Sequence, residues 1–279
     1  MRECFFVGNS SIGDFGLSGG DRIFVELARN WQNKIKLTLI GSEETISICK
    51  REGLSNIEFL KTSGKFLKGQ EKEVFTLRAI FGNFFIKLGR GILFVIKNRK
   101  LFRDSTIIYS VSDFYPDSIP AFLIKIMNRK VFWIASFYLF APVPWQKDNP
   151  YKGRNAGRGF LYWLSQIPIY WIINIFADVV FVTSLPDQKK FVTKKRNKSK
   201  VLVIRGGVDI AESEKYLNSD KIIAFDARKY DACFVGRFHH QKGVLVLVDI
   251  WGKVVKLKSN ARLAMVGNGS LEAEVKKKN

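Results

Sequence analysis

The chain has 279 residues, of which 47% are hydrophobic and 25% are charged. This length and composition predict a folded protein with a full core and two domains, and they exclude an intrinsically disordered chain. The formal net charge is +21, so the expected partners are anionic: phosphorylated small molecules, acidic lipids or nucleic acid. The three cysteines, Cys4, Cys49 and Cys233, have no metal-ligand spacing and form no even disulfide set, which indicates a reducing cytoplasm.

The first strand is expected at Glu3–Val7. A loop rich in glycine and serine follows over Asn9–Gly20, and a helix with apolar residues at helical spacing is predicted over Asp21–Trp31. A glycine-rich loop between a first strand and a first helix allows the backbone to approach a ligand closely. Gly19 and Gly20 are therefore candidate binding residues; the other interpretation is a plain flexible connection.

Strands and helices alternate along the first two thirds of the chain, which predicts a parallel sheet covered by helices. The predicted strands are Lys36–Ile40, Ile46–Cys49, Ile57–Leu60, Thr106–Val111, Lys130–Phe140 and Asp178–Thr183, and the predicted helices in the same part are Ala121–Met127 and Ser184–Thr193.

The segment Lys61–Arg103 combines many lysines and arginines with phenylalanine and isoleucine. A basic helix with apolar residues on its other side is typical of a segment that lies on an anionic bilayer, and Lys87, Arg90 and Lys97 would then face the lipid. The alternative is a surface helix that packs its apolar face on the domain.

A second apolar segment, Gly159–Val182, is long enough to cross a membrane. Gln166, Pro168, Asn174 and Asp178 interrupt it, and carboxylates within a bilayer are costly. A buried helix followed by a strand is the favoured interpretation.

The crossing between the two domains is expected near Arg205–Asp209, which gives domains at residues 1–204 and 205–279. In the second domain the strand Ala232–Val235 ends at Gly236, and a polar loop then leads to Gly243, where a long amphipathic helix begins. This geometry aims backbone N–H groups and the positive end of a helix dipole at an anion.

Arg237 and Lys242 add two positive charges to that loop, and both side chains are suited to phosphate. Spacing alone leaves two interpretations open, a phosphate site and an ordinary solvated turn. A second glycine turn, Gly267–Asn268–Gly269, follows the predicted strand Ala261–Val266.

Together these segments resemble the retaining glycosyltransferases with two Rossmann-like domains (GT-B type) of family four, the group 1 transferases. The resemblance covers the whole chain loosely and Asp231–Glu272 closely. It is carried by SGGDRIFVELARNW, SDFYPDSIP, ADVVFVTS, VLVIRGGVD, and FVGRFHHQKG followed by LAMVGNGSLE. The implied fold class is α/β with two Rossmann-like domains, the second of them incomplete.

The resemblance implies that Arg237 and Lys242, with Gly236 and Gly243, hold the diphosphate of a nucleotide-sugar donor. Positive side chains stabilise the leaving diphosphate as its charge develops, so neither a metal nor another cofactor is expected.

The resemblance also places Gly267 and Gly269 beside the nucleotide. Gly19 and Gly20 would line a facing loop of the N-terminal, acceptor-side domain. The acceptor would be a glycan or a lipid-linked molecule presented at the inner face of the cell membrane.

Two features depart from the family pattern. The only histidines are His239 and His240, so the histidine that many relatives carry in the N-terminal domain has no counterpart, and no catalytic residue is named. The pair of glutamates that grips the donor sugar is also missing, because the second domain is shorter by roughly a hundred residues than a doubly wound half requires. The strand that ends at Val266 should then form an exposed apolar edge.

The main hypothesis is thus the front part of a nucleotide-sugar transferase that acts at the cytoplasmic membrane face and is not assured of activity by itself. The alternative is a non-catalytic remnant that binds anions or membranes. A nucleic-acid binder is not favoured, because the chain has no base-reading motif and its basic residues are spread over several segments.

Overall fold

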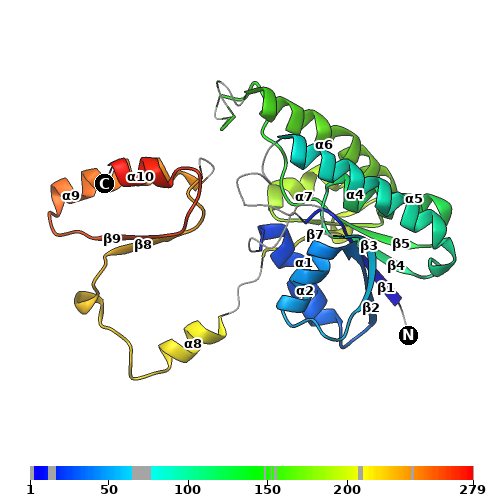
Figure 1. Cartoon of the computed structure of the whole chain (residues 1–279), viewed down its shortest axis with the longest axis horizontal. Coiled ribbons are helices and arrows are strands. Elements are labelled where there is room, and N and C mark those ends of the chain that lie inside the picture. The colour runs from blue at the N-terminus through cyan, green and yellow to red at the C-terminus, as the bar shows by residue number, and fades with distance from the viewer. Residues whose placement is uncertain are drawn as a thin grey trace. The chain divides into compact units, whose positions relative to one another are not determined.

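The computed structural model describes residues 3–11, 17–64, 77–147, 149–151, 153, 156–206, 210–239 and 242–278, with the side chains of the helix that begins at residue 77 described from residue 82 onward. The chain forms two compact units (Figure 1). The first unit comprises Met1–Trp145 and Gly153–Val208, and the second comprises Gln146–Lys152 and Asp209–Asn279.

The first unit is built on a seven-stranded sheet with the order β3-β2-β1-β4-β5-β6-β7, and all its neighbouring strands are parallel. The order reverses between β1 and β4, which in doubly wound sheets opens a crevice at the carboxyl ends of these strands. The strands are β1 (Glu3–Gly8), β2 (Lys36–Ser42), β3 (Glu58–Ser63), β4 (Ile107–Ser110), β5 (Phe132–Ser136), β6 (Val179–Val182) and β7 (Val201–Val203).

Helices cover both faces of this sheet (Figure 1). Successive strand residues point to opposite faces, so Phe5 joins the core beneath α4, α5 and α6, whereas Phe6 joins the core beneath α1 and α2. Helix α5 packs between α4 and α6. The helices of this unit are α1 (Gly19–Trp31), α2 (Glu43–Arg51), α4 (Leu77–Lys97), α5 (Tyr115–Met127), α6 (Ala156–Phe176) and α7 (Leu185–Phe191), with short 3-10 turns η1 (Arg99–Leu101) and η3 (Lys198–Lys200).

The second unit contains a two-stranded parallel sheet of β8 (Ala232–Val235) and β9 (Leu263–Val266). A small core of Phe238, Val244, Leu271 and Val275 holds its elements together. The other elements are α8 (Ala211–Leu217), the 3-10 turn η4 (Phe225–Ala227), α9 (Val244–Leu257) and α10 (Glu272–Lys278).

The predicted α/β class with Rossmann-like organisation is confirmed, and most strands lie within one or two residues of their predicted positions. The strand predicted at Ile46–Cys49 is wrong, because these residues lie inside α2. The helix has acidic residues in its first turn and basic residues in its last, which suits the helix dipole. A short apolar run does not distinguish a strand from one buried face of a helix.

The segment Gly159–Val182 does form a helix and then a strand, as predicted. The helix is not buried, however: α6 hides only Gly159, Gln166, Ile169 and Ile173. Among the described residues, no helix combines the length and the apolar character needed to cross a membrane.

The helix after β4 begins earlier than predicted. It begins at Tyr115 instead of Ala121, with a proline in its first turn, where a missing N–H costs no hydrogen bond. Helix α4 comes very close to it at Gly91, because a Cβ there would lie 2.9 Å from Cγ of Pro120. Glycine at this position therefore allows the close contact between α4 and α5.

Candidate functional site

The turns after β8 and β9 are joined through their backbones. The amide of Gly236 donates to the carbonyl of Val266 at 3.0 Å, and the amide of Phe238 donates to that of Asn268 at 2.7 Å. The amide of Leu271 in turn donates to the carbonyl of Phe238 at 3.0 Å. The two glycine turns of the sequence analysis thus form one structure.

Gly267 and Gly269 are required by this close contact. Their φ angles are +149° and +150°, a conformation that residues with side chains rarely adopt. A Cβ on Gly267 would lie 1.9 Å from the carbonyl oxygen of Gly236, and one on Gly269 would lie 2.6 Å from that of Phe238. Both glycines therefore have a structural role, whether or not a nucleotide lies beside them.

Helix α9 begins directly after the first of these turns. Gly243 is its N-cap, with a left-handed φ of +65°, and Arg237 and Lys242 are exposed on either side of the turn. Neither side chain forms a hydrogen bond or an ion pair with any described residue. Two cations without a described hydrogen-bond or ion-pair partner therefore lie in the turn that leads to the positive end of a helix, an arrangement that favours a bound anion. Residues 240 and 241, which include His240, lie outside the described part of the chain.

Gly19 and Gly20 are the first two residues of α1 and do not belong to the preceding loop. Ser18 caps the helix in a reciprocal pair of hydrogen bonds with Asp21, a capping box. A Cβ on Gly20 would lie 3.4 Å from the ring of Tyr138, and one on Gly19 would meet no atom within 4 Å. Most of the preceding loop, residues 12–16, lies outside the described part of the chain.

A buried carboxylate at the crevice between β1 and β4 was not singled out from the sequence. Asp117 is fully buried and accepts hydrogen bonds from the amides of Asn9 (2.6 Å) and Ser10 (2.9 Å). The hydroxyl groups of Ser10 and Ser112 also donate to it. Burial raises the pKa of Asp117 to about 6, although these hydrogen bonds act in the opposite direction. With its oxygens occupied, Asp117 ties the loop after β1 to the loop after β4.

Asp113 lies in the loop after β4, just before α5, whose first turn carries Asp117, and it too is almost completely buried. Its Oδ2 accepts a hydrogen bond from Nε2 of Gln166 at 2.9 Å, and Gln166 also bonds the backbone of Leu139 and Ala141. Burial is the main cause that raises the pKa of Asp113 to about 6. A carboxyl group with such a pKa takes up or releases its proton near pH 6. Both aspartates belong to SDFYPDSIP, the segment that follows β4, and two carboxylates so soon after a strand were the available signal.

Lys87 does not face outward as predicted. Only 1% of it is exposed, and its Nζ donates to the carbonyl of Ser11 at 2.6 Å and lies 3.2 Å from Oε2 of Glu44. Burial lowers the pKa of this lysine. Arg90 and Lys97 are exposed, as predicted; the helical period turns Lys87 inward because it shares a face with the buried Asn83 and Gly91.

No protein-family model matches the sequence, and no curated protein matches it. Solved structures do share its fold. A mutant of TarM from S. aureus, in complex with fondaparinux, alpha-GlcNAc-glycerol and UDP, aligns with a TM-score of 0.60 and 11% identity over 100% of this chain and 74% of that one. HepE from Anabaena, in complex with UDP and glucose, aligns with a TM-score of 0.53 and 11% identity over 100% of this chain and 65% of that one.

A Listeria monocytogenes protein whose assigned activity is UDP-N-acetylglucosamine 2-epimerase aligns with a TM-score of 0.50 and 10% identity over 99% of this chain and 64% of that one. The chain thus spans about two thirds to three quarters of the length of these structures. At such low identity the likeness establishes the α/β fold, and the chemistry has to be argued from this chain's own residues.

Proposed function

We propose that this chain belongs to a nucleotide-sugar glycosyltransferase and that it binds the donor diphosphate at the turn between β8 and α9. The observation that carries the proposal is the presence of two uncommitted cations, Arg237 and Lys242, at the N-terminus of a 14-residue helix. Support comes from the fold, which TarM and HepE share in structures that contain UDP.

Arg237 and Lys242 would assist the cleavage of the bond between the donor sugar and its diphosphate. Transfer of the sugar leaves a nucleoside diphosphate whose negative charge grows in the transition state, and preorganised positive groups stabilise that charge. Arg237 suits bidentate contact with phosphate oxygens, and Lys242 acts as a compact charge. Gly236 and Gly243 allow the backbone to turn at this point, and Gly267 and Gly269 hold the neighbouring turn beside it.

The rest of the proposal follows the family resemblance: transfer with retention of configuration, as in family four. Residues 205–279 would then be the donor side and residues 1–204 the acceptor side. Gly19 and Gly20 would lie near the acceptor, a glycan or lipid-linked molecule. No side chain is assigned as catalytic, because Asp117, the most buried acid among the described residues, is occupied in holding the loop after β1 to the loop after β4.

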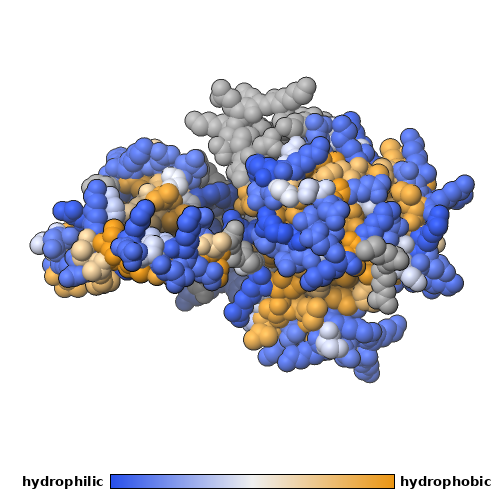
Figure 2. Space-filling model, turned by 90° about the horizontal axis from the view of Figure 1, so that it is seen from below, coloured by the Kyte–Doolittle hydropathy of each residue, from blue (hydrophilic) through white to orange (hydrophobic). Residues whose placement is uncertain are grey.

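Peripheral contact with an anionic membrane at the cytoplasmic face is part of the same proposal. Helix α4 exposes Phe85, Leu93 and Ile96, and α6 exposes Trp171 and Ile175. Figure 2 shows hydrophobic areas that interrupt the hydrophilic surface of the protein. Amphipathic helices with aromatic residues and neighbouring cations bind the interface of anionic bilayers.

The donor site is tested by the double variant Arg237→Ala, Lys242→Ala. Each hydrogen bond to a charged group contributes about 1.5–3 kcal/mol, so we expect calorimetry to show UDP binding weaker by several kcal/mol, with the affinity for uridine, which lacks phosphate, unchanged. Lys253→Ala with Lys256→Ala is the matched control, because it removes two exposed lysines from the far part of α9. Equal UDP affinity in both double variants would refute the diphosphate site.

The alternative is a protein that binds the nucleotide without transferring sugar. An assay of UDP released from UDP-glucose in the presence of candidate acceptors distinguishes the two. Release that depends on both the acceptor and Arg237 supports the transferase, whereas UDP binding without release supports the non-catalytic binder.

A further inference from the structure

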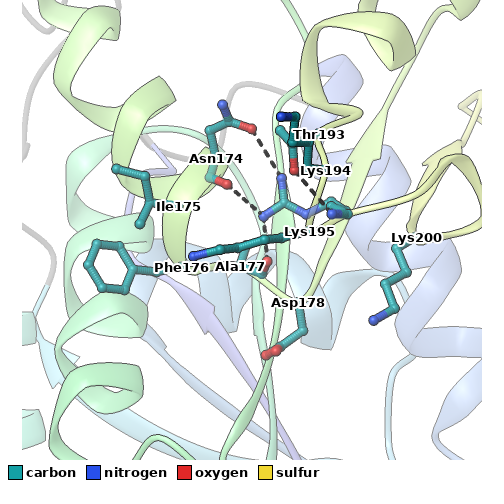
Figure 3. Close-up of a pocket in the computed structure, with 10 residues that line it drawn as sticks. Asn174, Ile175, Phe176, Ala177, Asp178, Thr193, Lys194, Lys195 and Lys200 are labelled. Atoms are coloured by element: carbon teal, nitrogen blue, oxygen red, sulfur yellow. Dashed lines mark hydrogen bonds between the residues drawn. The ribbon is translucent and has the colours of Figure 1, made fainter.

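A second basic site lies in the first unit, at the amino ends of strands of the large sheet. A pocket of about 370 Å³ is formed where α6 ends and where β6 and β7 begin, at the amino ends of the strands (Figure 3). The crevice between β1 and β4 lies at the carboxyl ends of the strands, so the pocket lies at the opposite, amino-terminal end of the sheet's strands. Its lining is Asn174, Ile175, Phe176, Ala177, Asp178, Thr193, Lys194, Lys195, Arg196 and Lys200.

Arg196 compensates the partial negative charge at the C-terminus of α6, which borders this pocket. Its buried guanidinium donates to the carbonyls of Ile173 and Asn174, each at 3.0 Å, and to that of Ala177. These carbonyls are the negative end of the α6 dipole. The Nε of Arg196 is buried and has no hydrogen-bond partner in the described structure.

The one acidic residue of the lining is already compensated. Asp178 accepts hydrogen bonds through Oδ2 from Nζ of Lys125 and from the amide of Trp133, both at 2.7 Å. The three lysines, in contrast, are exposed and form no hydrogen bond or ion pair with the described residues. Figure 3 shows Ile175 and Phe176 on one side of the pocket and Lys200 on the other. The pocket therefore holds an excess of positive charge beside an apolar rim.

We propose that this pocket binds a phosphate group, which is either a soluble phosphate or the headgroup phosphate of an anionic lipid. Lys194, Lys195 and Lys200 supply the charge as flexible point donors. Because Trp171 and Ile175 are exposed on the last turns of α6, a lipid would also find an apolar surface for its first methylenes. The site is separate from the proposed donor site and involves none of its residues.

The test compares three proteins that all carry Arg237→Ala and Lys242→Ala, so that phosphate at the turn between β8 and α9 does not contribute. The first has no further change, the second adds Lys194→Gln, Lys195→Gln and Lys200→Gln, and the third adds the control changes Lys34→Gln, Lys253→Gln and Lys256→Gln. All six lysines are exposed, so both triple variants should fold and both lose the same charge.

Two probes separate the sources of phosphate: inorganic phosphate in calorimetry, and sedimentation with phosphatidylcholine vesicles that contain phosphatidylglycerol. We expect the pocket variant to lose about tenfold or more in affinity for at least one probe, since each charged contact is worth about that factor, while the control variant loses little. Loss for phosphate assigns a soluble ligand, and loss for vesicles alone assigns a lipid headgroup. The proposal is overturned if the protein without further change binds neither probe, or if both triple variants bind alike. The donor site can fail its own test without affecting this result.

Discussion

Two buried aspartates at the crevice between β1 and β4 should make the stability of the first unit depend on pH. Asp113 and Asp117 are both buried, and burial raises the pKa of each from its ordinary value of 3.8 to about 6. Between about pH 4 and pH 6 the folded state therefore retains protons that the unfolded state releases. Their contribution to the free energy of unfolding falls as the pH rises through this window.

We expect Asp113→Asn to remove its share of this dependence. A pKa shift of two units corresponds to about 3 kcal/mol, so the free energy of unfolding of the variant should rise relative to the wild type by about 2–3 kcal/mol from pH 4 to pH 6. Urea denaturation at several pH values measures it. The exposed Asp220 provides the control through Asp220→Asn, which should run parallel to the wild type. If the free energy of unfolding of Asp113→Asn also runs parallel to that of the wild type as the pH changes, Asp113 does not hold a proton in the folded state as proposed.

At the scale of elements, the second unit depends on the contact between the turns after β8 and β9. These turns are held by three backbone hydrogen bonds from Gly236, Phe238 and Leu271, and the small apolar core around Phe238 adds few side chains. The absence of a side chain at Gly267 and Gly269 is therefore a condition for the contact between the two turns, because even one methyl group there would push the turns apart.

Gly267→Ala should disrupt this pairing. The Cβ of the alanine would overlap the carbonyl of Gly236, and we expect the free energy of unfolding to fall by about 3 kcal/mol or more. Hydrogen exchange followed by mass spectrometry should show reduced protection of β8 and β9. Gly252→Ala is the matched control, because this glycine lies within α9 with open space around it and alanine there should stabilise the helix by about 0.5–1 kcal/mol. Unchanged protection in Gly267→Ala would show that the turns tolerate a side chain.

The elements also show where sequence reasoning succeeds. Strongly apolar strands such as Val179–Val182 and capped helices such as α7, where Ser184 accepts from the amide of Asp187, carry their signals locally and are predicted well. Only Ile46–Cys49 of α2 is mistaken for a strand, because a short apolar run fits a strand and the buried face of a helix equally well. The partial exposure of α6 depends on which neighbours cover it, and no local pattern encodes that.

The candidate site divides in the same way. The basic glycine turn around Arg237 is visible as a motif, whereas the roles of Asp117 and Lys87 come from partners that lie 108 and 76 residues away in the chain, respectively. Charge alone predicted that Lys87 faces outward. Its burial beside Glu44 could only follow from the three-dimensional packing of α4 against the first loops.

At the scale of the whole molecule, the proposed contact with an anionic membrane rests on the charge of +21 and on the exposed apolar residues of α4 and α6. We expect Phe85→Ser, Trp171→Ser and Ile175→Ser together to reduce sedimentation with anionic vesicles, since burying one large apolar side chain contributes about 1.5–3 kcal/mol. Val246→Ser with Leu257→Ser, which changes exposed apolar residues of α9, should have little effect. Equal binding by both sets would remove α4 and α6 as the contact surface.

The hydrogen bonds that Asp117 accepts from Asn9, Ser10 and Ser112 have a further consequence for the order in which the chain folds. The amide of Asn9 and the carboxylate that it binds are 108 residues apart, and contacts of such long range form late because a large loop must close first. Strand β1 can pair early with its near neighbour β2, but its carboxyl end remains untied until α5 has been synthesised. During translation, therefore, Asn9 and Ser10 should become ordered only after α5 has been synthesised.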